Sequence, residues 1–182
     1  MLDSITTFIN NPEYHDILSI VKGFRNGAVY GAKIRLPHAF VMTFLFRTGS
    51  FKDKLYFIFD ATKTHSANLA KFVTIYKTLM YLQRKMVGKE QNGHSFMAGL
   101  IGGYYVFGEN NNVNQQLPVT RKAMDEPKHT FPIFAAVVWG IVMWLFRHDR
   151  DSLQPSLQAS MQYLYLDSDY WNSIKNFLWH NK

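Results

Sequence analysis

The sequence predicts an all-α fold, a multi-span bundle of transmembrane helices. Three observations support this prediction. Dense apolar segments alternate with polar connectors, as in helices that cross a bilayer. Between His65 and Lys85 the apolar residues recur at spacings of three and four, which places them on one helix face. In three segments small residues recur at every fourth position, a spacing that lets helices pack closely.

The chain is expected to form a single membrane domain over residues 1–182, beginning with a polar segment at 1–16. Apolar helices and connectors follow over 17–146. The first helix is predicted to begin at Ile17 and to end near Pro37, because proline removes a backbone donor from the helix ladder. The apolar run Ala39–Phe46 is too short to span alone and is expected at the membrane interface.

The next segments are read in the same way. "RTGSFKDK" predicts a polar turn, and Leu55–Phe59 is a short apolar patch. Ser95–Phe107 is another apolar segment, and Phe131–Phe146, with 16 residues and arginine just beyond it, comes nearest to a full span. Residues 151–182 predict an amphipathic tail with two modest helices that stays outside the bilayer.

The small residues spaced by four are predicted to be helix-packing positions. Glycine inside a soluble helix costs about 1 kcal/mol relative to alanine, so repeated glycines need a packing reason. The alternative is that they serve as turn residues or tight contacts in a soluble bundle. The predicted packing positions are Gly23, Gly27, Gly31, Ser95, Gly99, Gly103, Ala136 and Gly140.

The net charge of +7 is unevenly distributed. Lys22 to Lys85 holds 12 basic and two acidic residues, whereas the charges from Met86 onward nearly balance. A basic block beside apolar segments indicates anionic lipid or an acidic partner, and the fingerprints of nucleic-acid binding are missing. The residues assigned to the membrane edge, or to recognition by an import receptor, are Lys22, Arg25, Lys33, Arg35 and Arg47.

A polar run follows the Ser95–Phe107 segment. Its members, Glu109, Asn110, Asn111 and Asn112, are candidates for a polar vestibule, because a carboxylate at a membrane edge is a functional hypothesis by default. The alternative is a hydrogen-bonded loop that anchors neighbouring helices.

No catalytic residue, metal site or cofactor is predicted. The chain has no cysteine, and its seven histidines show no pair at metal-ligand spacing. It has neither a Gly-x-Ser-x-Gly elbow nor a Walker-type glycine loop. The N-terminal residues do not look like a secretory signal, and the last three are not the peroxisomal address Ser-Lys-Leu.

Several long strings resemble the peroxisomal membrane protein 4 family, the 24-kilodalton integral proteins of the peroxisome. The longest is "VKGFRNGAVYGAKIRLPHAFVMTFLFR", from Val21 to Arg47. Others are "VFGENNN" from Val106, "AVVWG" from Ala136, "WLF" from Trp144 and the stretch Leu153–Tyr165. Together they cover most of the chain.

The resemblance implies a multi-span protein of the peroxisomal membrane, grouped with the mitochondrial inner-membrane translocase subunits and without an established enzymatic activity. Members of the family continue after "GENNN" into a further apolar helix. Here residues 113–132 are polar and short, so this chain is expected to lack that span.

Three functions remain open at this point. One is a structural or assembly role in the peroxisomal membrane, with an import receptor, the bilayer and a homo- or hetero-oligomer as partners. The second is a pore or translocase-like component for small solutes or polypeptide. The third is a soluble helical protein. An enzyme fits least, because no acid–base or nucleophile constellation stands out.

Overall fold

The computed structural model describes residues 2–108 and 129–179, and every element in these two ranges is helical, which confirms the all-α prediction. The helices are α1 (Leu2–Ile9), α2 (His15–Phe46), α3 (Phe51–Val87), α4 (Asn92–Gly102), α5 (Thr130–His148), α6 (Pro155–Met161) and α7 (Ile174–Leu178). Shorter 3-10 or π turns are η1 (Pro12–Tyr14), η2 (Gly103–Phe107), η3 (Arg150–Ser152), η4 (Gln162–Leu166) and η5 (Asp167–Asp169).

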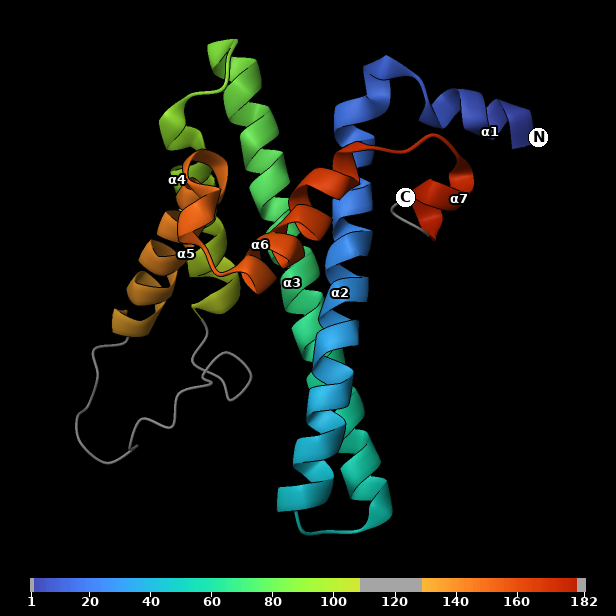
Figure 1. The fold of residues 1–182 in the computed structure, drawn as a ribbon, viewed down its shortest axis with the longest axis vertical. Helices are drawn as coiled ribbons and strands as arrows, with labels where there is room; N and C mark the ends of the chain where they lie inside the picture. The colour runs from blue at the N-terminus through green and yellow to red at the C-terminus, as the bar shows by residue number, and fades with distance from the viewer. Residues whose placement is uncertain (1, 109–128, 180–182) are drawn as a thin grey trace.

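Two helical hairpins make up the body of the molecule, and the C-terminal tail joins them. α2 pairs with α3, and α4 with its continuation η2 pairs with α5 (Figure 1). The tail passes from the end of α5 through α6, η4 and η5 to reach α2 (Figure 1). The core lies where both hairpins and the tail meet, and Phe72, Met143 and Met161 are among its fully buried side chains.

The α2–α3 pair is held together along a line of small residues. Nearly every fourth residue of α2 is small and buried, and these residues are Ser19, Gly23, Gly27, Gly31, Ala39 and Thr43. Without large side chains between them, the two backbones approach closely over most of the length of α2.

The prediction that a helix ends near Pro37 was wrong. α2 continues through Pro37 to Phe46, so this position does not mark a helix end at a membrane edge. Proline has no backbone N–H, so the helix loses only the hydrogen bond that residue 37 would donate to the carbonyl of Lys33. Beyond it Ala39 is buried with Ile58 and Ala61 of α3, and this packing continues the helix past the lost bond.

The polar turn after Phe46 is shorter than predicted. Ser50 and Asp53 form a capping box, each side chain bonding the other's backbone N–H, so α3 already begins at Phe51. α3 ends at Val87 and is capped by Gly88, whose positive φ of 79° lies in the left-handed region. The predicted helix from His65 to Lys85 is therefore the second part of a 37-residue helix.

Within the described ranges, α5 is the one helix long and apolar enough to cross a membrane by length and composition. Only 28% of its most apolar window is buried inside the protein. A core helix of a soluble protein would be mostly buried. The exposed apolar side chains of α5 therefore suit contact with lipid.

Candidate functional site

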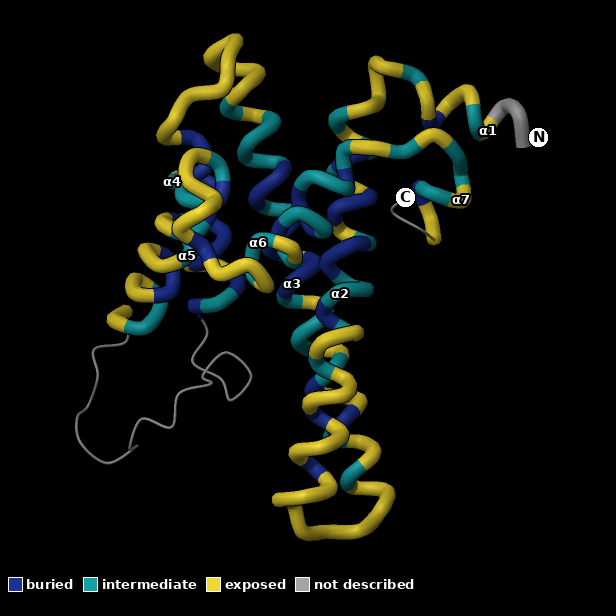
Figure 2. The backbone as a smooth tube through the Cα atoms, in the orientation of Figure 1, coloured by how far each residue is buried: buried dark blue, intermediate teal, exposed yellow. Residues whose placement is uncertain are grey.

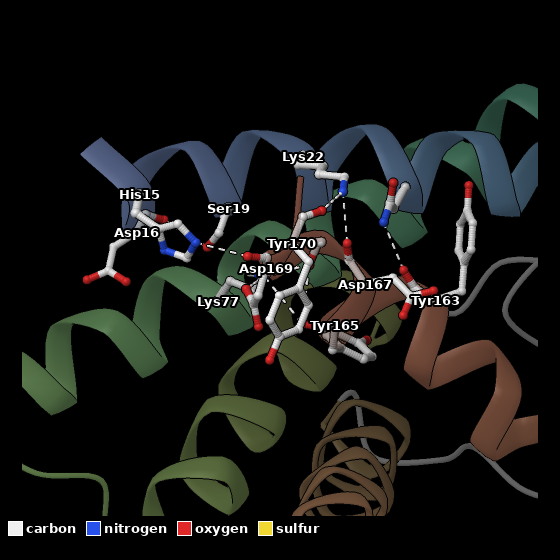
Figure 3. A network of polar contacts seen from close by, with 12 residues as sticks. His15, Asp16, Ser19, Lys22, Lys77, Tyr163, Tyr165, Asp167, Asp169 and Tyr170 are labelled. Carbon is white, nitrogen blue, oxygen red and sulfur yellow. Dashed lines mark hydrogen bonds and ion pairs between the residues drawn. The ribbon is translucent and has the colours of Figure 1, made fainter. Parts of the chain in front are cut away.

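The candidate site is a polar stripe on α2 that holds the C-terminal tail. Its members are His15, Lys22, Asn26 and Tyr30, each separated from the next by one or two turns of the helix. Figure 3 shows His15 and Lys22 on α2 beside the tail residues Asp167, Asp169 and Tyr170. The small-residue line is shifted from this stripe by one residue, which is about 100° around the helix. One face of α2 thus packs on α3, and an adjacent face presents donors to the tail.

Lys22 is the centre of this stripe. Its side chain is fully buried, and its ammonium donates to the backbone carbonyls of Asp167, at 2.9 Å, and of Tyr170. The ring of Trp171 lies 5.7 Å from the ammonium. These two carbonyls belong to the last turn of η5 and the residue after it, where helical carbonyls lack internal partners. The buried cation satisfies them.

The other stripe residues also bind the tail. Asn26, fully buried, donates from Nδ2 to the carbonyl of Tyr163 at 2.8 Å. His15 Nε2 lies 2.9 Å from the carbonyl of Asp169, and the hydroxyls of Tyr30 and Ser160 are hydrogen bonded. Most of these contacts are made to the main chain, so the stripe recognises the path of the tail backbone more than its side chains.

Lys77 holds the tail from α3. Its ammonium is 2.5 Å from Oδ1 of Asp169 and 2.5 Å from the hydroxyl of Ser168, and it also reaches the carbonyl of Tyr165 at 3.4 Å. Lys77 is 8% exposed and Asp169 is 38% exposed. A buried cation left without its partner is strongly destabilising, so this contact fixes the position of the tail.

A cavity of about 380 Å³ lies beside Lys77, at the end of the bundle where α2 begins and α3 ends. Two further ion pairs line it. Arg84 of α3 lies 2.7 Å from Asp16 of α2, and Arg147 Nε of α5 donates to Glu90 at 2.9 Å. With Lys77 and Asp169, the three pairs join α2, α3, α5 and the tail around one space.

Two buried tyrosines also line the cavity. The rings of Tyr76 and Tyr165 meet edge to face, with centroids 5.1 Å apart. Among the described residues neither hydroxyl has a hydrogen-bond partner. Burial raises the pKa of the Tyr165 phenol well above its ordinary value, so this group stays protonated and neutral.

This arrangement positions a chain segment. The cations that line the space, Lys77, Arg84 and Arg147, are paired with carboxylates. In the described ranges, no group of three or more His, Cys, Asp or Glu side chains is placed to hold a metal ion.

The structure places the predicted packing glycines between helices. A Cβ on Gly27 would come 2.7 Å from Cα of Ala70, and one on Gly31 would come 2.7 Å from Cα of Ser66. A Cβ on Gly23 would meet the side chains of Lys77 and Val73.

The second hairpin is packed in the same way. Gly99 and Gly103 of the α4 segment lie against Trp139 of α5, and Gly140 lies against Phe96. Ser95 and Ala136 are both buried. The predicted glycines of all three segments, and Ala136 against Gly103, thus lie in contacts between helices of this one chain.

The predicted basic residues are divided between two environments. Lys22 is buried in the tail contact, and half-buried Arg25 reaches the carbonyl of Asn176 at 3.5 Å. Lys33 is exposed and lies over the ring of Tyr163, Arg35 is half-buried, and exposed Arg47 stacks on Phe57. The vestibule residues Glu109, Asn110, Asn111 and Asn112 lie outside the described residues.

The sequence prediction missed Lys77, Asp167 and Asp169 as site residues. One indication was present for Lys77, which lies one turn after Val73 on the predicted apolar face of its helix. A charge on such a face needs a partner. The carbonyls of the tail had no signature in the sequence, because every residue carries one.

Comparison with known proteins is consistent with this architecture. The Tim17/Tim22/Tim23/Pmp24 family matches residues 14–120. Peroxisomal membrane protein 4 of Homo sapiens is 50% identical over an alignment that covers 100% of this chain and 93% of that protein. The protein of the same name from Bos taurus is 49% identical with the same coverage. No solved structure matches the chain significantly.

The alignment lengths also bear on the expected missing span. The alignment with the human protein spans 198 positions, whereas this chain has 182 residues. The human protein therefore has at least 16 residues within the aligned region that have no counterpart here. The placement of this difference after "GENNN" stays a prediction.

Proposed function

Because the chain belongs to the Tim17/Tim22/Tim23/Pmp24 family, we propose that it serves the peroxisomal membrane as a structural or assembly component without catalytic chemistry. It is a multi-pass protein of that membrane. The observation that carries the proposal is the tail contact. Lys22 from α2 and Lys77 from α3 both bind the segment that begins at the end of α5.

This contact gives the molecule a fixed shape. The hairpins α2–α3 and α4–α5 pack on each other through α3 and α4, and the tail adds to this contact, because it binds α2 and α3 while its residue Met161 joins the core cluster that both hairpins share. A fixed pair of hairpins is the property expected of a scaffold that presents constant surfaces to lipid and to partner proteins.

The proposed partners are the bilayer, a membrane-protein import receptor and further subunits. Recognition by an import receptor precedes insertion, so it needs basic and apolar residues that are accessible before the helices pair. Lys33 and Arg47 remain exposed even in the folded chain. Replacing both by glutamine should reduce capture by the receptor, whereas the same change at exposed Lys71 should not.

A pore or translocase-like component is the second candidate, and the cavity beside Lys77 favours it. Three ion pairs line this space, which lies at one end of the bundle. Against a continuous path, Gly27 of α2 packs directly on the Ala70 backbone, which leaves no room between α2 and α3 at that level.

Liposome reconstitution separates these two functions. The purified protein is inserted into liposomes loaded with solutes of graded size, and release is compared with that of protein-free liposomes. The structural proposal predicts no release above that background. Size-dependent release would overturn it in favour of the pore. Extraction of cell membranes with carbonate provides the control, because the protein should remain with the membranes.

A further inference from the structure

The closed end of the α2–α3 hairpin, residues 34–62 and here called the hairpin tip, extends beyond the rest of the molecule. α2 is about 48 Å long and α3 about 55 Å, whereas α5 reaches about 28 Å, at 1.5 Å per residue. In Figure 1 the tip projects past the end where α5 begins. A bilayer placed around α5, whose core is about 30 Å thick, leaves the tip at or beyond its far surface.

Large apolar side chains cover the hairpin tip. Its own core contains only Ala39, Ile58 and Ala61 as a buried cluster, and Figure 2 shows the tip mostly exposed. The exposed apolar side chains are Ile34, Leu36, Phe40, Val41, Met42, Phe44, Leu45, Phe46, Phe51, Leu55, Tyr56 and Phe59. An exposed apolar surface of this extent, on a segment that leaves the hydrocarbon region, marks a site of contact with lipid or with another protein.

The hairpin tip is also positively charged. It contains Arg35, Arg47, Lys52 and Lys54 against Asp53 and Asp60, with Lys33 and Lys63 directly at its borders. Asp53 is occupied by the capping box. All three ion pairs found in the described residues lie at the opposite end of the hairpin. The positive charge of the tip is therefore not neutralised by the rest of the described chain.

We propose that the hairpin tip binds the anionic headgroups of a lipid surface and anchors the end of the hairpin there. Aromatic and aliphatic side chains enter the boundary between headgroups and acyl chains, while lysine and arginine reach the phosphate groups. Arg47 stacked at 3.8 Å on Phe57, and Lys54 over Phe44, already combine a cation with an apolar ring. A second copy of the tip fits less well, because two basic surfaces repel each other.

This inference goes beyond the structural role, since a scaffold and a pore could both carry such an anchor. The absence of cysteine makes the test direct. Leu45, 69% exposed, is replaced by cysteine and labelled with a polarity-sensitive fluorophore in the full chain. The protein is reconstituted in nanodiscs of phosphatidylcholine alone or with about one-third phosphatidylserine.

With phosphatidylserine, the L45C label should shift to the blue and be quenched more strongly by spin labels at headgroup depth. A label on V138C, in the middle of α5, is the control and should not respond to headgroup charge. The double variant R47Q/K52Q should lose the response of the L45C label, with lipid affinity falling roughly fivefold for each charge removed. K71Q replaces an exposed lysine outside the tip, and the L45C label should still respond to phosphatidylserine in this variant.

Three results would overturn the proposal. The L45C label would behave identically in both lipid compositions, or R47Q/K52Q would respond as the parent does. The third is energy transfer between labels on two copies of the protein, increasing with the number of copies per nanodisc. This result would show that the tip binds a second copy instead of lipid. Circular dichroism of each variant establishes that the helices are intact, so none of these readings depends on a folding failure.

Discussion

Lys22 occupies a position that lysine rarely tolerates, because a buried ammonium loses its hydration. Two main-chain carbonyls and an indole ring replace the water, and no carboxylate forms a direct ion pair with it in the described part of the chain. Lys77, in contrast, has Asp169. The two lysines therefore hold the tail by different chemistry, and their removal should have different consequences.

Replacing Lys22 by methionine should lower the free energy of unfolding by about 1–3 kcal/mol. Methionine fills a similar volume, but the carbonyls of Asp167 and Tyr170 are left buried without their donor. Thermal unfolding in detergent, followed by circular dichroism, measures the change. K71M removes an exposed lysine from α3 and should stay within about 0.5 kcal/mol of the parent. Equal effects of the two variants would contradict the assignment.

The Lys77–Asp169 pair predicts strong coupling between its members. D169N alone should cost roughly 2 kcal/mol, because the buried ammonium loses its counter-charge. The double variant K77M/D169N should cost less than the sum of the single variants, by at least about 1 kcal/mol in a double-mutant cycle. The exposed pair of Asp16 and Arg84 is the comparison, and D16N should cost less than about 1 kcal/mol. Additive effects at Lys77 and Asp169 would argue against a direct contact.

At the scale of elements, spacing predicted the helices well and their ends less well. The small-residue repeat indicated the packing line of α2, and the apolar spacing after His65 indicated the buried face of α3. Pro37 was taken as a helix end because a local rule was applied without the partner helix. Ala39 and Thr43 continue the repeat beyond it, and this continuity was the better guide.

Gly27 gives the sharpest test of the helix pair. Alanine is the better helix former by about 1 kcal/mol, so a substitution without steric conflict should stabilise the chain. At Gly27 the added Cβ would meet the backbone of Ala70 at 2.7 Å, which forces α2 and α3 apart. G27A should therefore destabilise by about 1–3 kcal/mol.

Gly93 provides the matched control for this substitution. It lies in the first turn of α4, and a Cβ there meets no atom within 4 Å. G93A should be neutral or slightly stabilising. If G27A were equally harmless in chemical or thermal unfolding, the close approach of α2 and α3 would be wrong.

At the scale of the whole molecule, the tail is the part that the sequence left least defined. Two modest helices and a location outside the bilayer were expected of residues 151–182, but their docking place depends on backbone carbonyls and on burial. Neither is visible in a residue pattern. The contact between the tail and the polar stripe therefore emerges only when the distant segments are placed in space.

If the tail holds the two hairpins in a fixed arrangement, releasing it should loosen only the region it touches. We expect the full chain carrying both K22M and K77M to show faster amide hydrogen exchange in α2 between residues 15 and 30 and in the tail between 155 and 171. The rate should rise about tenfold for each 1.4 kcal/mol of lost stabilisation. The hydrogen bonds described between α2 and the tail fall at residues 15–30, so residues 34–62 should keep their parental rates and serve as an internal control. Exchange that is equally faster in residues 15–30 and in the part of α2 beyond residue 34 would mean that the two lysines support global stability. The tail would then not stabilise the hairpins locally.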